Sequence, residues 1–531
     1  MPEPGVKIRK VVVVETSGPE DKGEYVLLHN NGPADADLSG WRLGDAELHP
    51  VLPFVYEFPS GRILLAGADL RIHSTSGVDD AKNLFWGHHD SLVWTNTQDR
   101  VVLVDKAEQL VDTMEWFNRP PHGRVVRTDE IREDIASRAA AQGFGAPLGA
   151  VQWGVREDDT EFFWQEFSAG GAIFHSGFPT DDAPEKHVNH VRAEIYKKYK
   201  NSSGGETAKS VKQFGLPLTS TASASVGEDP AMSVPNAPGP PSREPFFNDF
   251  ETSSIYWSEK TGAQIVRGTI RDKWKELGGS DGPFGLPVSD ELPDDAVGTD
   301  LRFSDFEKGS IWSTRNQVRA ITEIRIDFVG FRCFGEEEID QDEVYFAFEA
   351  KPLNRPRAKD PEEGVWVGTL PLEGEPYGGV DNGGSYDAAG GQSGAAITVF
   401  QGRPAPIEVN IRAWEHDSGG PNAFRDVIKS AVSAAAAVGA ALVPAGAAVF
   451  LNPDVQETVT NAINALAGTD DEFIGRGQWR INSRQEMLNF LDGPLIGEPG
   501  DHLRRHKDFD IIAPDGDAFY KPAFKIVPVA L

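Results

Sequence analysis

Three clusters of acidic residues in the last third of the chain have the composition of a divalent-cation site. They lie at 338–343, 415–417 and 470–472, each beside a strand-like segment. Calcium takes about six to eight oxygen ligands, which carboxylates from several loops at one end of a β-sandwich can supply. The expected calcium ligands are Asp340, Asp342, Glu415, Asp417 and Asp471. The alternative is that these acidic loops are merely solvated.

A second group of residues, in the middle of the chain, has the chemistry of a carbohydrate site. Sugar C–H faces stack on aromatic rings, whereas sugar hydroxyls need directional partners such as carboxylates. Both types occur in two aromatic segments, 246–257 and 303–312. The residues expected to bind such a ligand are Tyr256, Trp257, Trp312, Asp249, Glu251, Asp305 and Glu307. The alternative is a hydrophobic hairpin core in which the acids are only solvated.

Motifs for catalysis do not accompany these clusters. The sequence contains neither a Gly-x-Ser-x-Gly elbow nor a His-Glu-x-x-His motif, and no Walker-type or dinucleotide loop follows a predicted strand. Paired carboxylates for glycoside hydrolysis stay open, because sequence spacing says nothing about their spatial separation. The dense group His88, His89 and Asp90 indicates surface histidines, with a zinc or copper contact as the alternative. We therefore predict a protein that is not an enzyme.

The elements that would position these residues begin with a β-rich segment from 7 to 116. Short runs of β-branched and aromatic residues alternate there with turn signals such as Pro59-Ser60-Gly61. The motifs at 24–30, 37–43, 58–61, 70–74, 84–87 and 93–97 follow in the order of the lamin-tail pattern. The segment thus resembles a lamin-tail-type domain, which implies an immunoglobulin-like sandwich with an adaptor role. We expect Trp86 and Trp94 in its core.

A repeated motif follows this segment. Phe214-Gly215-Leu216-Pro217 recurs as Phe284-Gly285-Leu286-Pro287, each copy precedes an aromatic hairpin, and an earlier copy starts at 147. The pattern resembles LGFP-type repeats and covers about 143–320 in three units. The first unit lacks the proline, and the second carries a long insert before Phe246. Such repeats bury their hydrophobic faces against neighbours. The resemblance implies binding to cell-wall polysaccharide or another glycan.

From 321 to the end, β-type runs return and predict a second β-sandwich. Strict alternation at 344–348 and 407–411 favours half-buried antiparallel strands. The order of strands and acidic clusters is loosely similar to calcium-dependent lipid-binding domains. A helical insert is expected at about 422–468. Its segment 430–451 has no charged residue and is long enough to span a bilayer, but Pro444 and the many Ala and Gly residues favour a buried hairpin.

Bulk composition limits the classes of function. The 531 residues include 51 basic and 82 acidic ones, a net charge of −31, which disfavours nucleic-acid binding. A single cysteine, Cys333, excludes an internal disulfide and reads as a buried strand residue. The first residues lack the basic start and apolar run of a secretory signal, which leaves cytoplasmic residence or non-classical export open.

The predicted fold is mainly β and multidomain: a lamin-tail-type domain at 1–120, a helical connector at 121–142, repeats at 143–320 and a β-sandwich with a helical insert at 321–531. The expected function is that of a non-catalytic, extracellular or envelope-associated protein that binds a glycan, with calcium as the one expected cofactor. One alternative is an effector that acts on membranes through 430–451 or through an unrecognised hydrolase. Another is a scaffold for a partner protein.

Overall fold

The computed structural model describes residues 5–13, 23–45, 54–87, 93–94, 98–117, 123–157, 160–177, 187–224, 245–294, 296–335, 342–353, 366–371, 376–389, 395–416, 472–513 and 516–529. Strands predominate, which confirms the predicted mainly β, multidomain class. The chain forms two compact units. The first comprises Met1–Ala140, Pro147–Glu166 and Ile173–Val188, and the second Ala141–Ala146, Phe167–Ala172 and Asn189–Leu531.

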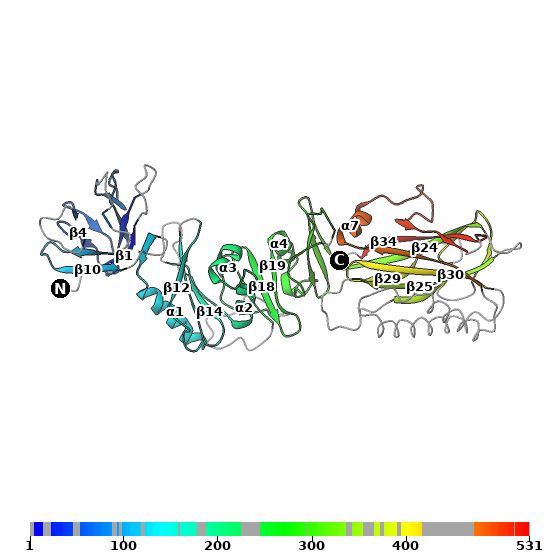
Figure 1. Ribbon diagram of the computed structural model, residues 1–531, viewed down its shortest axis with the longest axis horizontal. Helices are drawn as coiled ribbons and strands as arrows, with labels where there is room; N and C mark the ends of the chain where they lie inside the picture. Colours follow the sequence, from blue (N-terminus) through cyan, green and yellow to red (C-terminus); the bar gives the residue numbers. More distant parts are fainter. Residues whose placement is uncertain are drawn as a thin grey trace. The chain divides into compact units, whose positions relative to one another are not determined.

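The first unit begins with a β-sandwich of two main sheets (Figure 1). One sheet has the order β11-β1-β2-β7-β8, with bounds Arg124–Val126, Val6–Val12, Tyr25–Asn30, Asp69–His73 and Asn83–Phe85. The other has the order β10-β9-β4-β5, with bounds Leu110–Trp116, Asp99–Val104, Arg42–Gly44 and Val55–Glu57. A small sheet pairs β3 (Ala36–Asp37) with β6 (Ile63–Leu64). Because β11 pairs with β1, this sandwich extends beyond residue 120.

The core of this sandwich contains the tryptophans expected there. Trp94 is buried, and Trp86 packs against the same cluster with its ring edge-on to Trp94. Buried apolar residues alternate along β7, as the period of a strand requires, and in β1 a bulge between Ile8 and Lys10 shifts the alternation by one residue. The predicted core position is confirmed for Trp94, whereas Trp86 is partly buried and packs against the core.

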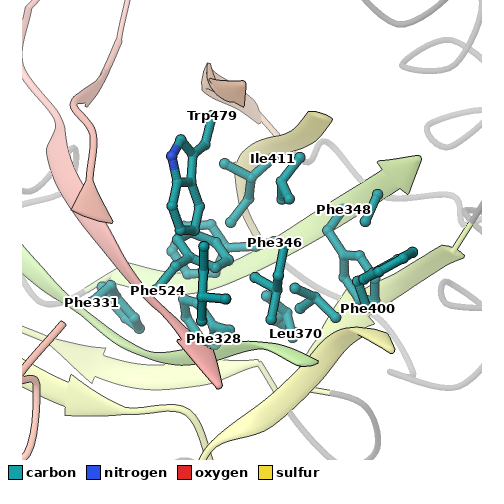
Figure 2. Packing of buried hydrophobic residues seen from close by; sticks show 14 of the residues in the cluster. Phe328, Phe331, Phe346, Phe348, Leu370, Phe400, Ile411, Trp479 and Phe524 are labelled. Carbon is teal, nitrogen blue, oxygen red and sulfur yellow. The ribbon is translucent and has the colours of Figure 1, made fainter. Parts of the chain in front are cut away.

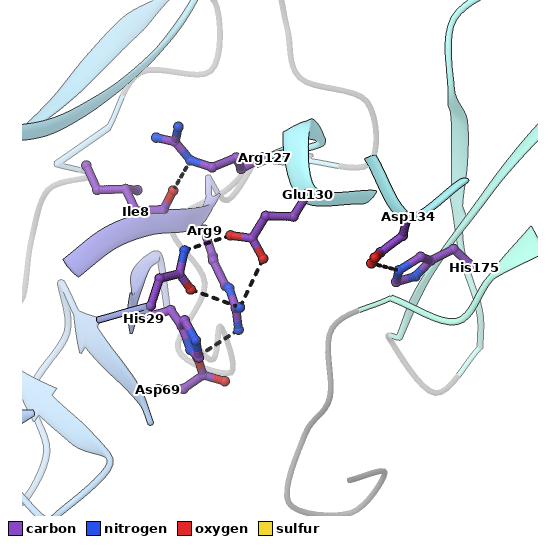
Figure 3. Close-up of polar contacts among 9 residues, drawn as sticks. Ile8, Arg9, His29, Asp69, Arg127, Glu130, Asp134 and His175 are labelled. Carbon is purple, nitrogen blue, oxygen red and sulfur yellow. Dashed lines mark hydrogen bonds and ion pairs between the residues drawn. The ribbon is translucent and has the colours of Figure 1, made fainter. Parts of the chain in front are cut away.

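Helix α1 (Asp129–Gln142) is fastened to the sandwich by a polar network (Figure 3). The Arg9 Nη2 atom lies 3.3 Å from Glu130 Oε2, and the Asn31 side-chain amide donates to Glu130 Oε1 at 2.8 Å. Burial lowers the pKa of Arg9, although the carboxylates of Asp69 and Glu130 oppose this effect. The guanidinium stays charged and holds the start of α1 against the sheet, because its pKa remains far above neutral in proteins.

The next sheet has the order β12-β13-β14-β15, with bounds Gln152–Val155, Glu161–Glu166, Ala172–His175 and Val188–Val191. Within the first unit, Glu161 joins it to the sandwich. Its carboxylate accepts from Lys10 Nζ at 2.8 Å and from Arg124 Nη1 at 2.7 Å. Burial alone would raise the pKa of Glu161, but these two cations hold it below its ordinary value. Ion pairs of Glu161 therefore join this sheet to the sandwich, in addition to the contacts of α1.

In the second unit, the same arrangement of helix and four-stranded sheet occurs twice more. One copy contains α2 (Ala193–Asn201), α3 (Thr207–Phe214), β16 (Ala222–Ser223), β17 (Phe246–Asp249), β18 (Ser253–Ser258) and β19 (Gly262–Arg267). The other contains α4 (Gly268–Glu276), η3 (Gly279–Asp281), β20 (Leu292–Pro293), β21 (Arg302–Phe306), β22 (Gly309–Ser313) and β23 (Val318–Ile321). In each sheet the strands pair in chain order. We call 129–191, 192–267 and 268–321 repeats 1, 2 and 3.

The last part of the second unit is the expected second β-sandwich (Figure 1). One sheet has the path β28-β24-β34-β32, with bounds Ser385–Asp387, Glu323–Gly335, Phe519–Val529 and Lys507–Asp508; β29 (Ile397–Gly402) and β33 (Ile511–Ile512) also pair there. The other has the path β26-β25-β30-β31, with bounds Trp366–Leu370, Asp342–Pro352, Ile407–Glu415 and Glu472–Ile481; β27 (Tyr377–Val380) pairs with β25. Helix α7 spans Arg484–Asp492.

Aromatic rings fill the core of this sandwich. Figure 2 shows Phe328 and Phe524 from one sheet close to Phe346 and Trp479 from the other. Cys333 belongs to the same buried cluster, as its position in an apolar strand predicted. The expectation of half-buried strands is wrong for β30, because every residue from Ile407 to Glu415 is buried. The alternation of apolar and polar residues identified the core face of β30 correctly. It gave no information on whether the opposite face is covered.

The predicted helical insert at about 422–468, including 430–451, lies outside the described residues. The same is true of His88, His89 and Asp90. Among the helices that the structure describes, none combines the length and the apolar character needed to cross a bilayer.

Candidate ligand-binding site in the repeats

The motif Phe-Gly-Leu-Pro forms a tight turn that a downstream carboxylate holds in place. Gly215 has a φ of +81°, and a Cβ at this position would come within 2.4 Å of the Glu251 side chain. The Glu251 Oε2 atom accepts a hydrogen bond from the Leu216 backbone N–H at 3.1 Å. Only glycine combines the left-handed conformation with this close approach. Glu251 therefore stabilises the Phe-Gly-Leu-Pro turn of its own repeat.

Repeat 3 has the same arrangement. Gly285 has a φ of +67°, and Glu307 Oε2 accepts from the Leu286 backbone N–H at 3.1 Å. In repeat 1 the matching motif is Phe144-Gly145-Ala146-Pro147, so the expectation that the first unit starts at 147 and lacks the proline is wrong. The hydroxyl of Ser168 takes the role of the glutamate there and accepts from the Ala146 backbone N–H at 3.0 Å. The side chains of Glu251 and Glu307, which we expected to bind a ligand, are thus engaged in stabilising the turns.

The two predicted aspartates each pair with a cation of a helix outside their own repeat. Asp249 lies 2.8 Å from Lys275 Nζ of α4. Asp305 lies 2.8 Å from Arg484 Nη2 at the start of α7, and both side chains are buried. The Arg484 guanidinium also sits over the Phe303 ring, 3.4 Å from its centroid. These carboxylates join one layer of the array to the next, as a repeat protein requires.

Tyr256 and Trp312 lie in the interior, so the expectation that their rings face outward is wrong. Tyr256 is 7% exposed; it stacks on Phe247 and meets Trp274 of α4 edge-on. Trp312 is 1% exposed and belongs to the core of the C-terminal sandwich. Burial raises the pKa of Tyr256, which stays protonated. Each ring fills the space between its hairpin and the next element, because the following layer covers that hairpin face.

Trp257 alone among the predicted aromatic residues is partly exposed. It follows Tyr256 in β18 and therefore points to the opposite face of the sheet. Its ring stacks on Phe246, with centroids 4.6 Å apart and an interplanar angle of 26°. The cross-strand neighbour on the other side is Ala263, which has only a methyl group. One ring face is thus supported from within the sheet.

The position of Trp257 is occupied differently in the other repeats. Each hairpin turn has a matching residue, Gly171, Ser253 or Gly309, and the fourth residue after it is His175, Trp257 or Ser313. His175 is buried and donates from Nε2 to Asp134 of α1 at 3.0 Å, since its Nδ1 accepts from the Gly177 N–H (Figure 3).

In repeat 3 the hydroxyls of Ser313 and Thr269 lie 2.7 Å apart, so a strand-to-helix hydrogen bond occupies this place. A helix residue therefore satisfies the strand residue in repeats 1 and 3. In repeat 2 the strand residue is an indole ring. The sequence carried this signal, because aligning the three hairpins places one aromatic residue opposite two hydrogen-bonding ones.

The predicted calcium ligands are only partly within the described structure. Asp340, Asp417 and Asp471 lie outside it, and of Asp342 only the backbone is described, at the start of β25. Glu415 is buried at the end of β30, where the strand register places it beside Val344 and Glu472. Of the three acidic segments, the described residues Glu343, Glu415 and Glu472 therefore lie at one end of this sheet. Among the residues that the structure describes, no group of three His, Cys, Asp or Glu side chains is arranged to hold a metal ion.

Two family models match parts of the chain. Residues 1–118 match the Lamin Tail Domain, and residues 238–282 match the LGFP repeat. These matches confirm both resemblances inferred from the motifs. No curated protein matches the chain. The LGFP match lies in repeats 2 and 3 and contains Trp257. A lamin-tail sandwich joined to LGFP repeats fits a modular surface or cell-envelope protein.

Proposed function

We propose that this chain is a non-catalytic, modular protein of the cell envelope that binds a glycan through repeat 2. The observation that carries the proposal is the partly exposed ring of Trp257, which is backed by Phe246 and lies within the segment that matches the LGFP repeat. Aromatic faces of this kind accept the C–H surface of a sugar ring. The other residues predicted to bind a ligand stabilise the turns of the repeats or the packing between them.

The surroundings of Trp257 favour a rigid platform. In the β18–β19 turn, the Ser258 and Thr261 hydroxyls lie 2.8 Å apart, and the Gln264 side chain donates to the Thr261 carbonyl at 2.8 Å. These bonds hold the turn that follows the ring. A pre-organised platform loses little conformational entropy when a ligand binds, so more of the contact energy appears as affinity.

In repeat 2, contact with a ligand would break no strand-to-helix hydrogen bond of the kind seen in repeats 1 and 3. Replacing the strand residue in repeat 1 or 3 would break the pair His175–Asp134 or Ser313–Thr269. Trp257 stacks on Phe246, and within the described ranges no hydrogen bond links its indole to a helix. We therefore place one binding position in the array and not three.

The experiment is co-sedimentation of the full chain with insoluble, purified envelope polysaccharide. Trp257→Ala should weaken binding about tenfold, because a stacked and buried aromatic ring contributes on the order of 1.5 kcal/mol. Trp366→Ala is the matched control: Trp366 is 39% exposed but lies in β26 of the C-terminal sandwich. Equal retention of wild type and Trp257→Ala would show that repeat 2 is not the binding site.

A further inference from the structure

In repeats 1 and 3, one helix position hydrogen-bonds to the strand position that corresponds to Trp257. The pairs are Asp134 with His175 at 3.0 Å (Figure 3) and Thr269 with Ser313 at 2.7 Å. In both pairs the helix residue comes directly before a buried isoleucine. This position is therefore where the helix of a repeat meets the third strand of its sheet.

In repeat 2 the same helix position is Glu194, which comes directly before the buried Ile195 of α2. The register of α2 agrees with that of α4. Four residues after the isoleucine, Tyr199 of α2 and Trp274 of α4 each donate to the carbonyl of the motif glycine, at 2.7 and 3.1 Å. Helix α2 also packs against β18 and β19, as α4 packs against β22 and β23. The equivalence of the repeats therefore places Glu194 beside Trp257.

The Glu194 carboxylate and the Trp257 ring are both accessible. Glu194 is exposed, and Trp257 is partly exposed. Within the described ranges, no hydrogen bond or ion pair engages the Glu194 carboxylate, and none engages the Trp257 indole N–H. The charge of Glu194 acts on Arg192, where it opposes the lowering of the pKa of Arg192 by burial. Repeat 2 thus presents an aromatic face, a donor and an acceptor at one place.

These groups match the hydroxyls of an uncharged sugar. An ionised carboxylate only accepts hydrogen bonds, and its two oxygens can accept from two neighbouring hydroxyls of a sugar ring. Such charge-assisted bonds are about twice as strong as neutral ones. The C–H face of the same sugar ring can stack on Trp257. A uronic acid or phosphate group would instead meet the like charge of Glu194, which is unfavourable.

We propose that Glu194 determines the specificity of the glycan site in repeat 2, so that the site accepts uncharged sugars and rejects acidic ones. This inference rests on the proposed function, because Glu194 acts on a sugar that Trp257 holds. Asp134 and Thr269 cannot take this role, since each is engaged with the strand of its own repeat.

The test uses purified envelope polysaccharide, separated by charge into a neutral and an acidic fraction and immobilised on beads. The full-length wild type should bind the neutral fraction about tenfold more tightly than the acidic one. Glu194→Gln should weaken binding to the neutral fraction about tenfold and reduce this preference, because the amide has one acceptor oxygen and no charge. Glu133→Gln is the matched control, because it removes the same charge from an exposed position of α1 and should change neither value.

Trp257→Ala separates a failure of this inference from a failure of the proposed function. Weaker binding by Trp257→Ala, together with wild-type affinity and preference in Glu194→Gln, would overturn the role of Glu194 and keep repeat 2 as the glycan site. Unchanged binding by Trp257→Ala, or no binding of the wild type to either fraction, would overturn both.

Two further results would also contradict the role of Glu194. One is equal or tighter binding of the acidic fraction by the wild type, which would mean that the carboxylate does not select against charge. The other is a melting temperature of Glu194→Gln clearly below that of Glu133→Gln, which would assign Glu194 to the fold. We expect the two variants to melt together, because neither carboxylate has a hydrogen-bond partner within the described ranges.

Discussion

Glu24 in the N-terminal sandwich should make the stability of that sandwich depend on pH near neutrality. The residue is 1% exposed, and its Oε2 atom accepts from the backbone N–H groups of Val93 and Trp94 at 2.7 and 3.4 Å. Burial raises the pKa of Glu24 to about 7, although these two hydrogen bonds oppose the shift. The charge of Asp99 raises it further.

The magnitude follows from the two pKa values. The ordinary value is 4.5 and the folded value about 7, so at about 1.4 kcal/mol per pKa unit the ionised carboxylate costs the folded state about 3 kcal/mol. A raised pKa means that the folded state binds the proton more tightly than the unfolded state. The cost is therefore absent below pH 4.5, grows between pH 4.5 and 7, and is complete above pH 7.

Glu24→Gln should remove this cost, because the neutral amide keeps a carbonyl oxygen for the Val93 N–H. Above pH 7 the variant should exceed wild type by up to about 3 kcal/mol, and at pH 4.5 the difference should vanish. Hydrogen exchange of peptides covering β1 and β2 in the full chain, corrected for intrinsic rates between pH 4.5 and 8.5, reports this locally. Glu115→Gln on the exposed side of β10 is the matched control.

Wild-type protection that is independent of pH, together with weaker protection of Glu24→Gln at every pH, would contradict this expectation. That result would mean that the ionised carboxylate is held firmly by the backbone donors of Val93 and Trp94. Hydrogen bonds to the charged form would then outweigh burial.

Three further outcomes are expected. Trp312→Ala should lower the free energy of unfolding by about 3 to 5 kcal/mol, whereas Trp257→Ala should lower it by less than about 1 kcal/mol, as denaturant unfolding will show. Glu307→Ala should cost about 1 to 3 kcal/mol in the same assay, because the Leu286 N–H loses its acceptor, and Glu307→Gln should retain most of that stability. Millimolar calcium should raise the melting temperature of the wild type and have less effect on Glu415→Gln; an unchanged temperature in the wild type would remove the calcium proposal.

Sequence patterns predicted the domains and repeats of this protein better than the residues of its candidate binding site. The order of motifs is set by local requirements, such as the positive φ of Gly215 and Gly285, and these requirements are visible in the residues themselves. Alternation also predicted correctly that Ile407 and Val409 face a core. It could not predict that Glu408 and Asn410 are buried as well, because that depends on the surroundings of the sheet and not on the strand.

The aromatic residues show the same limit at the candidate site. The pattern places Tyr256 and Trp257 on opposite faces of β18, but not which face receives the next layer of the array. That choice depends on Trp274 of α4, which meets the ring of Tyr256. A repeat cannot bury its faces alone, so the packing of its neighbours decides which ring remains available.

Residues that repeats 2 and 3 share serve the stacking of the repeats. Glu251 and Glu307 hold equivalent turns, and Asp249 and Asp305 each form an ion pair with a helix outside their own repeat. At the end of the array this partner is Arg484, the first residue of α7.

The Asp294 carboxylate accepts from the backbone N–H groups of Arg484 and Gln485, both at 3.1 Å, so the C-terminal sandwich closes the last repeat as a cap. The proposed ligand contact is placed where the repeats differ, since the shared residues are engaged in packing. His175, Trp257 and Ser313 differ at one structural position, which is why the indole of repeat 2 is the strongest candidate for contact with a glycan.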